Sequence, residues 1–358
     1  MFRFISQRLL AAIPVLLGIL FVTFALARLL PGDPCRAMLG EKATDQICDA
    51  FNVRYGLNEP ISTQFAIYLG DVFQGDLGTS FRYGRPVTQI MVERLPVTIE
   101  LSLCALIFAT IIGVFAGMWS AYKRNSIIDV TTMVIANIGV SMPVFWLGLM
   151  LAYLFGLALK DTPFQLPPSG RNSPGLIVPS LQEAWNLNLQ PGPLDSLLSF
   201  LSNMHLFNGL VTLNWQVFSD TARHMLLPAA ALGTIPLAII ARMTRSSLLD
   251  VLGLDYVRTA RAKGLRERGV VMRHGMSNAL IPVVTIIGLS LGGLLGGAVL
   301  TETIFNLSGV GRILFDAIQA RDYSIVQGFT LIIAAAYVLI NLFVDLLYAF
   351  LDPRVRLG

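Results

Sequence analysis

The chain has 358 residues, of which 54% are hydrophobic and only 13% are charged, and its mean hydropathy is +0.67. A typical globular domain has about a quarter of its residues charged, so this composition excludes most water-soluble folds and indicates a polytopic membrane protein. The net charge of +4 is no sign of nucleic-acid binding, because basic residues of membrane proteins mostly set orientation. Three cysteines are too few for a disulfide framework, and three histidines leave little material for a metal site.

A transmembrane helix needs about 20 apolar residues, and several segments meet or approach that length. They are Leu9–Leu30, Ile99–Tyr122, Val130–Leu159, Met225–Ala241, Leu280–Leu300 and Gly328–Leu351. The first is interpreted as a retained helix, because Pro31-Gly32-Asp33-Pro34 follows it in place of the small-residue cleavage site of a signal peptide. The sequence therefore predicts an all-α protein with six transmembrane helices.

Lysine and arginine residues are concentrated between alternate segments. Residues 1–8, 122–129, 242–279 and 352–358 are roughly three times as rich in basic residues as residues 31–98, 160–224 and 301–327. The positive-inside rule places the first group, and with it both termini, in the cytoplasm. The predicted organisation has three parts: residues 1–30 (tail and first helix), residues 31–98 (an external segment) and residues 99–358. The third part is a core of five transmembrane helices with an external insertion at 160–224 and a cytoplasmic loop at 242–279.

The external segment 31–98 contains a predicted amphipathic helix and a pair of cysteines. Apolar residues recur on one helical face between Pro60 and Gly75. This pattern predicts a helix on the membrane surface or against a neighbouring subunit, or else a packed helix with no specific partner. Cys35 and Cys48 both lie in this segment, and the outside of a bacterial membrane permits disulfides. A disulfide between them and two buried free thiols are equally open at this point.

The cytoplasmic loop 242–279 is rich in arginine. Asp255 is predicted to cap a helix over Tyr256–Lys263, and Gly264 is placed to end it in a left-handed turn. A second short helix then leads towards the fifth segment. The expected result is a helix–turn–helix elbow with Tyr256, Arg258, Thr259, Arg261 and Lys263 facing outward. We interpret it as a docking element for a cytoplasmic partner; the alternative is a basic loop that fixes topology and touches lipid headgroups.

The sequence has no P-loop. That motif needs a glycine directly followed by lysine, and the lysines here follow Glu41, Tyr122, Leu159 and Ala262. If this chain takes part in ATP-driven transport, the hydrolysis must therefore occur on another polypeptide.

Several stretches along nearly the whole chain resemble one family, in the same order. They are Asp255-Tyr-Val-Arg-Thr-Ala-Arg-Ala-Lys-Gly-Leu265, Asn278-Ala-Leu-Ile-Pro282, Leu30-Pro-Gly-Asp-Pro34, Gly75-Asp-Leu-Gly-Thr-Ser80, Thr301-Glu-Thr-Ile-Phe305 and Val344-Asp-Leu-Leu-Tyr348. These stretches are similar to those of ABC-importer permeases of the dipeptide/oligopeptide, binding-protein-dependent family. The triplet Arg258-Thr259-Ala260 departs from the Glu-Ala-Ala of the general importer signature, which narrows the resemblance to the peptide subgroup.

The resemblance implies a type I ABC-importer permease fold in the bacterial cytoplasmic membrane. It implies that the chain forms half of a translocation path for peptides, together with a second permease subunit. It further implies an extracytoplasmic substrate-binding protein and two cytoplasmic ATPase subunits, which would hold the ATP and magnesium. The chain itself would have no catalytic residue and bind no cofactor or metal. In this family the elbow is the ATPase-coupling loop, which assigns that role to Tyr256, Arg258, Thr259, Ala260, Arg261, Lys263 and Gly264.

Two groups of residues within the membrane are further candidates. Asn137 and Ser141 lie one turn apart in the third segment, and we assign them to the polar translocation path. Gly288, Gly292 and Gly296 recur at intervals of four in the fifth segment, and small residues at such spacing let helices approach closely. They are assigned to packing against the second permease subunit, with packing inside this chain an equal alternative.

Other functions stay open as alternatives. The same permease type could import glutathione-like compounds or nickel complexes. An ion-coupled secondary carrier is a different class, although inverted repeats and charged mid-membrane helices are not obvious here. Gly288-Leu-Ser-Leu-Gly292 formally matches the G-x-S-x-G pattern of an intramembrane serine protease, but Ser290 lies in mid-helix. No histidine is expected to reach it, because His205 and His224 lie outside or at the outer surface and His274 is cytoplasmic.

Overall fold

The computed structural model describes residues 2–29, 35–36, 43–54 and 56–351, which form helices and loops with a single isolated β-bridge between Thr79 and Pro86. The helices of membrane-spanning length, with α6 and α7 taken together as one bent pair, are α1 (Phe2–Leu29), α5 (Val87–Tyr122), α6 (Ile127–Ser141), α7 (Val144–Tyr153), α11 (Trp215–Leu252), α14 (Met276–Gly297) and α17 (Tyr323–Leu351). The shorter helices are α3 (Asp45–Arg54), α4 (Ile61–Phe73), α8 (Leu181–Ala184), α9 (Pro193–Ser202), α10 (His205–Val211), α12 (Asp255–Ala262), α13 (Glu267–Gly269), α15 (Val299–Ile304) and α16 (Val310–Gln319). Two π-helical turns, Leu154–Ala158 and Val270–Gly275, follow α7 and α13.

Five of the described helices are long and apolar enough to cross a membrane, and the count is six if the bent pair α6–α7 is one span. The prediction of an all-α polytopic protein is therefore confirmed. Most helices run past their predicted bounds; α11, for example, has 38 residues although Pro228 and Pro236 lie inside it. Each internal proline removes only its own hydrogen bond, and the packed surroundings hold the helix together.

The predicted third span, Val130–Leu159, is wrong as one continuous helix. The chain breaks after Ser141, and α6 and α7 meet at 104°. Met142 has extended backbone (ψ 132°) and Pro143 caps the start of α7. A residue before proline is disfavoured in the α region, so the Met142-Pro143 pair ends one helix and starts the next. Hydropathy alone does not register such a break, because both sides of it are apolar.

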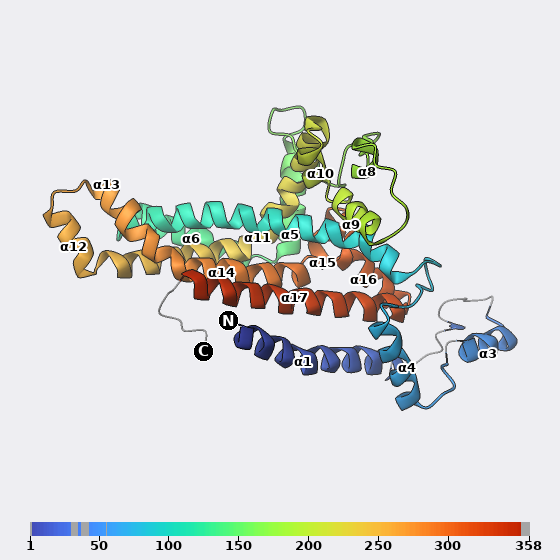
Figure 1. Cartoon of the computed structure of the whole chain (residues 1–358). Coiled ribbons are helices and arrows are strands. Elements are labelled where there is room, and N and C mark those ends of the chain that lie inside the picture. Colours follow the sequence, from blue (N-terminus) through green and yellow to red (C-terminus); the bar gives the residue numbers. More distant parts are fainter. Residues whose placement is uncertain (1, 30–34, 37–42, 55, 352–358) are drawn as a thin grey trace.

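The long helices run side by side, with the connecting segments gathered at the two ends of the bundle (Figure 1). Helices α12 and α13 lie at one end. Helices α3, α4, α15 and α16 lie at the opposite end, and the short helices α8–α10 project near that end too (Figure 1). The first part of α1 and the last part of α17 both point towards the α12 end (Figure 1).

The core is the crossing of α5 and α11, where small residues bring the two backbones together. A Cβ atom at Gly113 would lie 2.9 Å from the carbonyl oxygen of Leu237, and one at Gly233 would lie 2.8 Å from that of Ala105. At Gly117 it would collide with the carbonyl oxygen of Ala241. Glycine at these positions permits a contact that any side chain would prevent.

The segment before α5 is folded onto the bundle at the end opposite α12. Helix α4 begins after Pro60 and ends before Gly75, whose φ is +83°, as predicted. Its apolar face packs on α1, where Phe65 contacts the ring of Phe21 at a centroid distance of 5.6 Å and Tyr68 stacks on Phe24 at 5.9 Å. The predicted amphipathic helix therefore covers the end of the first span.

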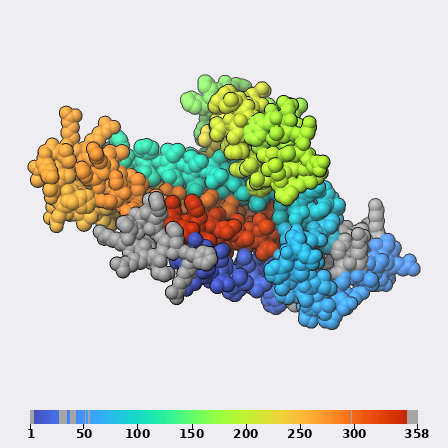
Figure 2. Space-filling view, in the orientation of Figure 1, coloured from blue at the N-terminus to red at the C-terminus, as the bar shows by residue number. Residues whose placement is uncertain are grey.

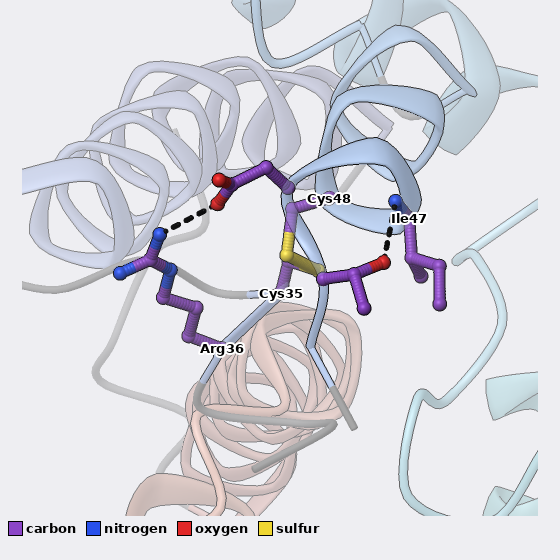
Figure 3. Close-up of a disulfide and its surroundings, with 6 residues drawn as sticks. Cys35, Arg36, Ile47 and Cys48 are labelled. Carbon is purple, nitrogen blue, oxygen red and sulfur yellow. Dashed lines mark hydrogen bonds and ion pairs between the residues drawn. A yellow bond between two sulfur atoms is a disulfide. The ribbon is translucent and has the colours of Figure 1, made fainter. Parts of the chain in front are cut away.

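Cys35 and Cys48 form a disulfide, and both are buried (Figure 3). This resolves the two possibilities left open by the sequence. Beside the bond, Arg36 forms an ion pair with Asp45 at 2.9 Å, and the hydroxyl of Thr44 accepts a hydrogen bond from the backbone N–H of Ile47 at the start of α3 (Figure 3). Ala43, Leu57 and Phe81 pack against the two cysteines, so the disulfide lies in a small apolar cluster of its own.

Candidate functional site

The most prominent functional candidate is the elbow, defined here as residues 253–275 between α11 and α14. It protrudes from one end of the molecule as an isolated lobe, shown in orange in Figure 2. Helix α12 starts at Asp255 and ends at Ala262, and Gly264 follows with φ +76°. The predicted glycine stop is confirmed. The N-cap of α12 was predicted one residue too late, because Leu254 is the N-cap and Asp255 is already helical.

A small apolar core makes the elbow one rigid unit. Val257 and Ala260 of α12 are 0% and 6% exposed, and they pack against Val270 of the π-helical turn that leads to α14. At its base, Val271 and Met276 pack on Leu248 of α11. A force applied to α12 therefore reaches both α11 and α14 without passing through a flexible joint.

Polar contacts stiffen the elbow further. Arg261 pairs with Glu267 through two hydrogen bonds of 3.1 and 2.8 Å, and this pairing raises the pKa of Arg261. The hydroxyl of Tyr256 donates to the carbonyl oxygen of His274 at 3.1 Å and accepts from the side-chain amide of Asn278 at 2.7 Å. Tyr256 and Arg261 thus belong partly to the internal scaffold of the elbow.

The exposed surface of α12 is smaller than the sequence suggested. Ala260, one of the predicted coupling residues, is buried against Val270 and is not available to a partner, because the helix turns its small residues inward. Arg258, Thr259, Lys263 and Gly264 are exposed. The side chain of Arg258 is 72% exposed and has only a weak 3.4 Å contact with Asp255. These residues, with the exposed ring face of Tyr256, form the free face of α12.

A buried ion pair ties the bundle together near the elbow. Arg245 of α11 holds Asp129 of α6 through two hydrogen bonds of 2.6 and 2.7 Å, and Ser120 of α5 donates to the same carboxylate. Asp129 also accepts from the backbone N–H of Asn125 in the turn between α5 and α6. Helices α5, α6 and α11 are therefore joined at one carboxylate. This contact could not be predicted from the sequence, because Asp129 and Arg245 are 116 residues apart.

The two predicted path residues behave differently from each other. Asn137 lines a hollow of about 500 Å³ between α6 and α11. The side-chain oxygen of Asn137 accepts a hydrogen bond from Arg242 at 2.7 Å. Ser141 donates to the backbone carbonyl of Asn137 at 2.9 Å and does not line that hollow. The structure therefore brings Asn137 together with Arg242, and it leaves Ser141 at the end of α6.

The glycines of α14 divide into two groups. Gly288 packs against Val344 and Gly292 against Tyr337, both in α17 of the same chain, so these two do not present a face to another subunit. The four-residue spacing of Gly288 and Gly292 therefore serves packing inside this chain, which was one of the two possibilities left open by the sequence. Gly296 has no atom within 4 Å of the place a Cβ would take, and the same holds for Gly293. Ser290 donates to the carbonyl oxygen of Ile286 in its own helix at 2.7 Å, as an ordinary helical serine does.

The insertion, defined from the structure as residues 160–214, is fastened to the bundle by a buried ion pair. Arg171 contacts Glu100 of α5 at 2.6 Å, with side-chain exposures of 15% and 3%. Glu100 also accepts from the backbone N–H of Leu206 at 2.6 Å. Burial lowers the pKa of Arg171, and burial together with the charge of Arg171 lowers the pKa of His205 to about 3, so His205 is neutral. Its Nδ1 lies 2.6 Å from the side-chain oxygen of Asn172.

A second buried carboxylate organises the end opposite the elbow. Glu302 of α15 accepts from the hydroxyl of Thr98 at 2.5 Å and from the backbone N–H of Arg312 at 3.0 Å. The carboxylate thus lies at the N-terminus of α16, where the helix dipole favours negative charge. Burial nevertheless dominates and raises the pKa of Glu302 to about 7.

Residues 113–357 match the model of the binding-protein-dependent transport system inner membrane component, and residues 1–102 match the N-terminal model of the same membrane component. Together these matches cover nearly the whole chain. The chain belongs to this family. It is therefore a multi-pass component of a bacterial inner membrane transport system.

Individual relatives are similar over their full length. The chain is 45% identical over 99% of its length to the dipeptide transport system permease protein DppB of Alkalihalophilus pseudofirmus, covering 100% of that protein. It is 44% identical to the di/tripeptide transport system permease protein DppB of Pseudomonas aeruginosa, with 99% of both chains covered. The glutathione transport system permease protein GsiC of Pectobacterium atrosepticum is 37% identical, again with 99% of both chains covered.

Proposed function

We propose that this chain is the permease subunit of an ATP-driven dipeptide importer. The observation that carries the proposal is the full-length similarity to dipeptide permeases, at 45% and 44% identity. The glutathione permease is less similar, at 37%, so a peptide substrate is favoured over a glutathione-like compound. A nickel complex, an ion-coupled carrier and an intramembrane protease have no support from these relatives or from the position of Ser290 in mid-helix.

The elbow is the point at which we expect the ATPase to act. The sequence has no P-loop, so ATP and magnesium would be bound by partner subunits and the chain itself would hydrolyse nothing. The free face of α12 is the contact surface, and the Arg261–Glu267 pair and the Val257–Val270 packing keep it rigid. Helix α11 has 38 residues; at about 1.5 Å per residue it carries a movement of the elbow across the whole membrane.

The remaining partners follow from the family. A substrate-binding protein would deliver the peptide at the end opposite the elbow, and a second permease subunit would complete the path. Within α14, the side that carries Gly293 and Gly296 is open to the second subunit. Gly288 and Gly292 are not part of that surface, because they pack against α17. Asn137, beside Arg242, is a candidate for the polar lining of the path on the elbow side.

Charge reversal on α12 tests the coupling. In the intact complex reconstituted into lipid, Arg258→Glu with Lys263→Glu should abolish peptide uptake and peptide-stimulated ATP hydrolysis. The matched control is Lys123→Glu with Arg124→Glu, which makes the same charge change at the exposed turn between α5 and α6 and should retain most activity. Equal uptake by the α12 variant and the unmodified complex would refute the elbow as the coupling element.

A further inference from the structure

Two hollows lie along one face of α11. The first, of about 290 Å³, is bounded by α7, α11 and α14, and the second, of about 500 Å³, is bounded by α6 and α11. From α11, Leu232 and Ile235 line the first hollow, Ile239 lines both, and Arg242 and Ser246 line the second. Steps of three and four residues keep these side chains on one face of the helix. The two hollows are therefore parts of one surface that follows α11 towards the elbow.

The surface changes from apolar to basic along its length. Among the described residues that line the first hollow, the only polar side chain is that of Ser290, whose hydroxyl is bonded to the carbonyl oxygen of Ile286 in its own helix. The second hollow contains two arginines, Arg242 and Arg245, and its apolar lining includes two methionines. An anionic group on a ligand is therefore attracted to the elbow end of the surface.

Arg242 is the arginine of this hollow whose charge is not compensated. Arg245 is paired with Asp129 through two hydrogen bonds. Arg242 forms no ion pair with a described residue; its Nη1 donates to the neutral side-chain oxygen of Asn137 at 2.7 Å, and no acid belongs to the described lining of the hollow. The Arg242 side chain is exposed, so a ligand in the hollow can reach its remaining N–H donors.

The chemistry of Arg242 suits a carboxylate. A guanidinium group is always charged in proteins, and it can donate two parallel N–H bonds to the two oxygens of one carboxylate. The bond to Asn137 restricts the side chain without neutralising its charge. Every dipeptide with a free C-terminus presents one such carboxylate.

The methionines beside Arg242 suit the variable part of such a ligand. Met133 of α6 and Met243 of α11 line the same hollow, and the unbranched thioether side chain of methionine adapts to partners of different shape. A cation in one place next to an adaptable apolar wall accepts ligands that share a carboxylate and differ in their side chains. Dipeptides as a class have this chemistry.

We propose that Arg242 binds the C-terminal carboxylate of the transported peptide, and that the face of α11 from Leu232 to Ser246 is part of the wall of the translocation path. This inference rests on the proposed transport function and names the substrate group that the path recognises. Asn137 positions the guanidinium group and does not itself bind the carboxylate. Because an ion pair exposed to water is weak, Arg242 holds the peptide briefly and then releases it.

Protection of a cysteine measures this binding at the site itself. Ser246→Cys is placed in a Cys104→Ala background, in the complex with the second permease and the ATPase subunits in phosphatidylcholine nanodiscs. Mass spectrometry of this chain follows its modification by N-ethylmaleimide, and the substrate-binding protein is left out so that its own selectivity does not enter. Dialanine should slow the modification, and alanyl-alaninamide, which lacks the carboxylate, should need an about fivefold higher concentration for the same protection. Equal protection by the two peptides, or protection by neither, would overturn the proposal.

Variants assign the preference for the carboxylate to Arg242. Arg242→Gln should remove most of the preference for dialanine, whereas Arg242→Lys, which keeps the charge but not the planar fork, should retain part of it. Arg223→Gln is the matched control, because it makes the same change at an exposed position of the same helix outside both hollows, and it should keep the full preference. Since Arg242 is exposed, Arg242→Gln should not lower the unfolding temperature, which distinguishes a ligand contact from a structural role. A preference that survives Arg242→Gln would contradict the assignment.

The same assay separates the peptide from a lipid headgroup, whose phosphate an arginine also binds. If phosphatidylglycerol in the nanodiscs slowed the modification and dialanine had no effect, Arg242 would hold a lipid phosphate and the proposal would be wrong. ATP-driven uptake of dialanine by the unmodified complex tests the transport function by itself. Uptake without protection refutes only the role of Arg242, and protection without uptake refutes the transport function.

Discussion

At the residue scale, buried carboxylates decide how distant parts of the chain are joined. Glu100, Asp129 and Glu302 are each 3% exposed or less, and each collects hydrogen bonds from another helix or loop. A charge removed from water is tolerated only when its partners replace the lost hydration. Each acid therefore specifies one arrangement of the segments around it, and an incorrect arrangement would leave it unpaired.

The Arg171–Glu100 pair gives a prediction at this scale. Arg171→Met should destabilise the protein by about 3 kcal/mol, because removing one partner of a buried pair leaves the other charge uncompensated. The measurement is SDS-induced unfolding of the purified chain. Arg85→Met is the matched control, since Arg85 and Glu93 are as close, at 2.8 Å, but 41% and 39% exposed. If Arg85→Met lowered the stability as much as Arg171→Met does, burial of the ion pair would not be the reason for the destabilisation.

At the element scale, the crossing of α5 and α11 depends on backbone contact. Three glycines occupy the crossing, and a Cβ atom at any of them would meet backbone carbonyl oxygens of the other helix. Backbone atoms cannot swing aside as side-chain ends can, so the helices would have to separate. The two helices contribute Ser120 and Arg245, which bind Asp129, and α11 leads into the elbow. The spacing of the two helices therefore also affects the position of the elbow.

Gly117→Ala tests this contact. We expect a loss of about 1–3 kcal/mol in SDS-induced unfolding, as for overpacked cores. Gly18→Ala in α1 is the control, because nothing lies within 4 Å of its added methyl group. There alanine's better helix propensity should leave stability unchanged or raise it by up to about 1 kcal/mol. If both variants unfold alike, close packing at the crossing is not what holds these helices.

At the scale of the whole molecule, the chain has two unlike ends. One end has the small, basic and rigid elbow, and the other has the insertion and α4 with the disulfide (Figures 1 and 2). A disulfide forms in an oxidising compartment, which agrees with an extracytoplasmic position of its end. The basic elbow agrees with a cytoplasmic position of the other.

This orientation can be checked by single-cysteine labelling in a Cys104→Ala background. Ile177→Cys lies in the insertion at a position 84% exposed, and it should react with a membrane-impermeant maleimide in spheroplasts. Lys263→Cys in the elbow should react only after the membrane is permeabilised. The reverse pattern would invert the topology and remove the elbow from contact with a cytoplasmic ATPase.

The features predicted correctly are those that depend on neighbouring residues. Gly264 ends α12, and Pro60 and Gly75 bound α4, because turn chemistry is local. Features that depend on the neighbour of a helix could not be predicted in this way. Ala260 was assigned to coupling and lies inside the elbow, and packing against α17 is the one of two open alternatives that holds for Gly288 and Gly292, because a helical period does not show which neighbour covers a face.

The sequence by itself determined the membrane class, the approximate spans, the elbow and the family, since apolar length, charge bias and local motifs are properties of contiguous residues. Only the tertiary structure decided the 104° break at Met142-Pro143, the pairing of Cys35 with Cys48, and the Arg171–Glu100 and Arg245–Asp129 ion pairs. The ion pairs join residues far apart in the chain. Their positions are fixed by how helices pack, and packing is a property of several elements together.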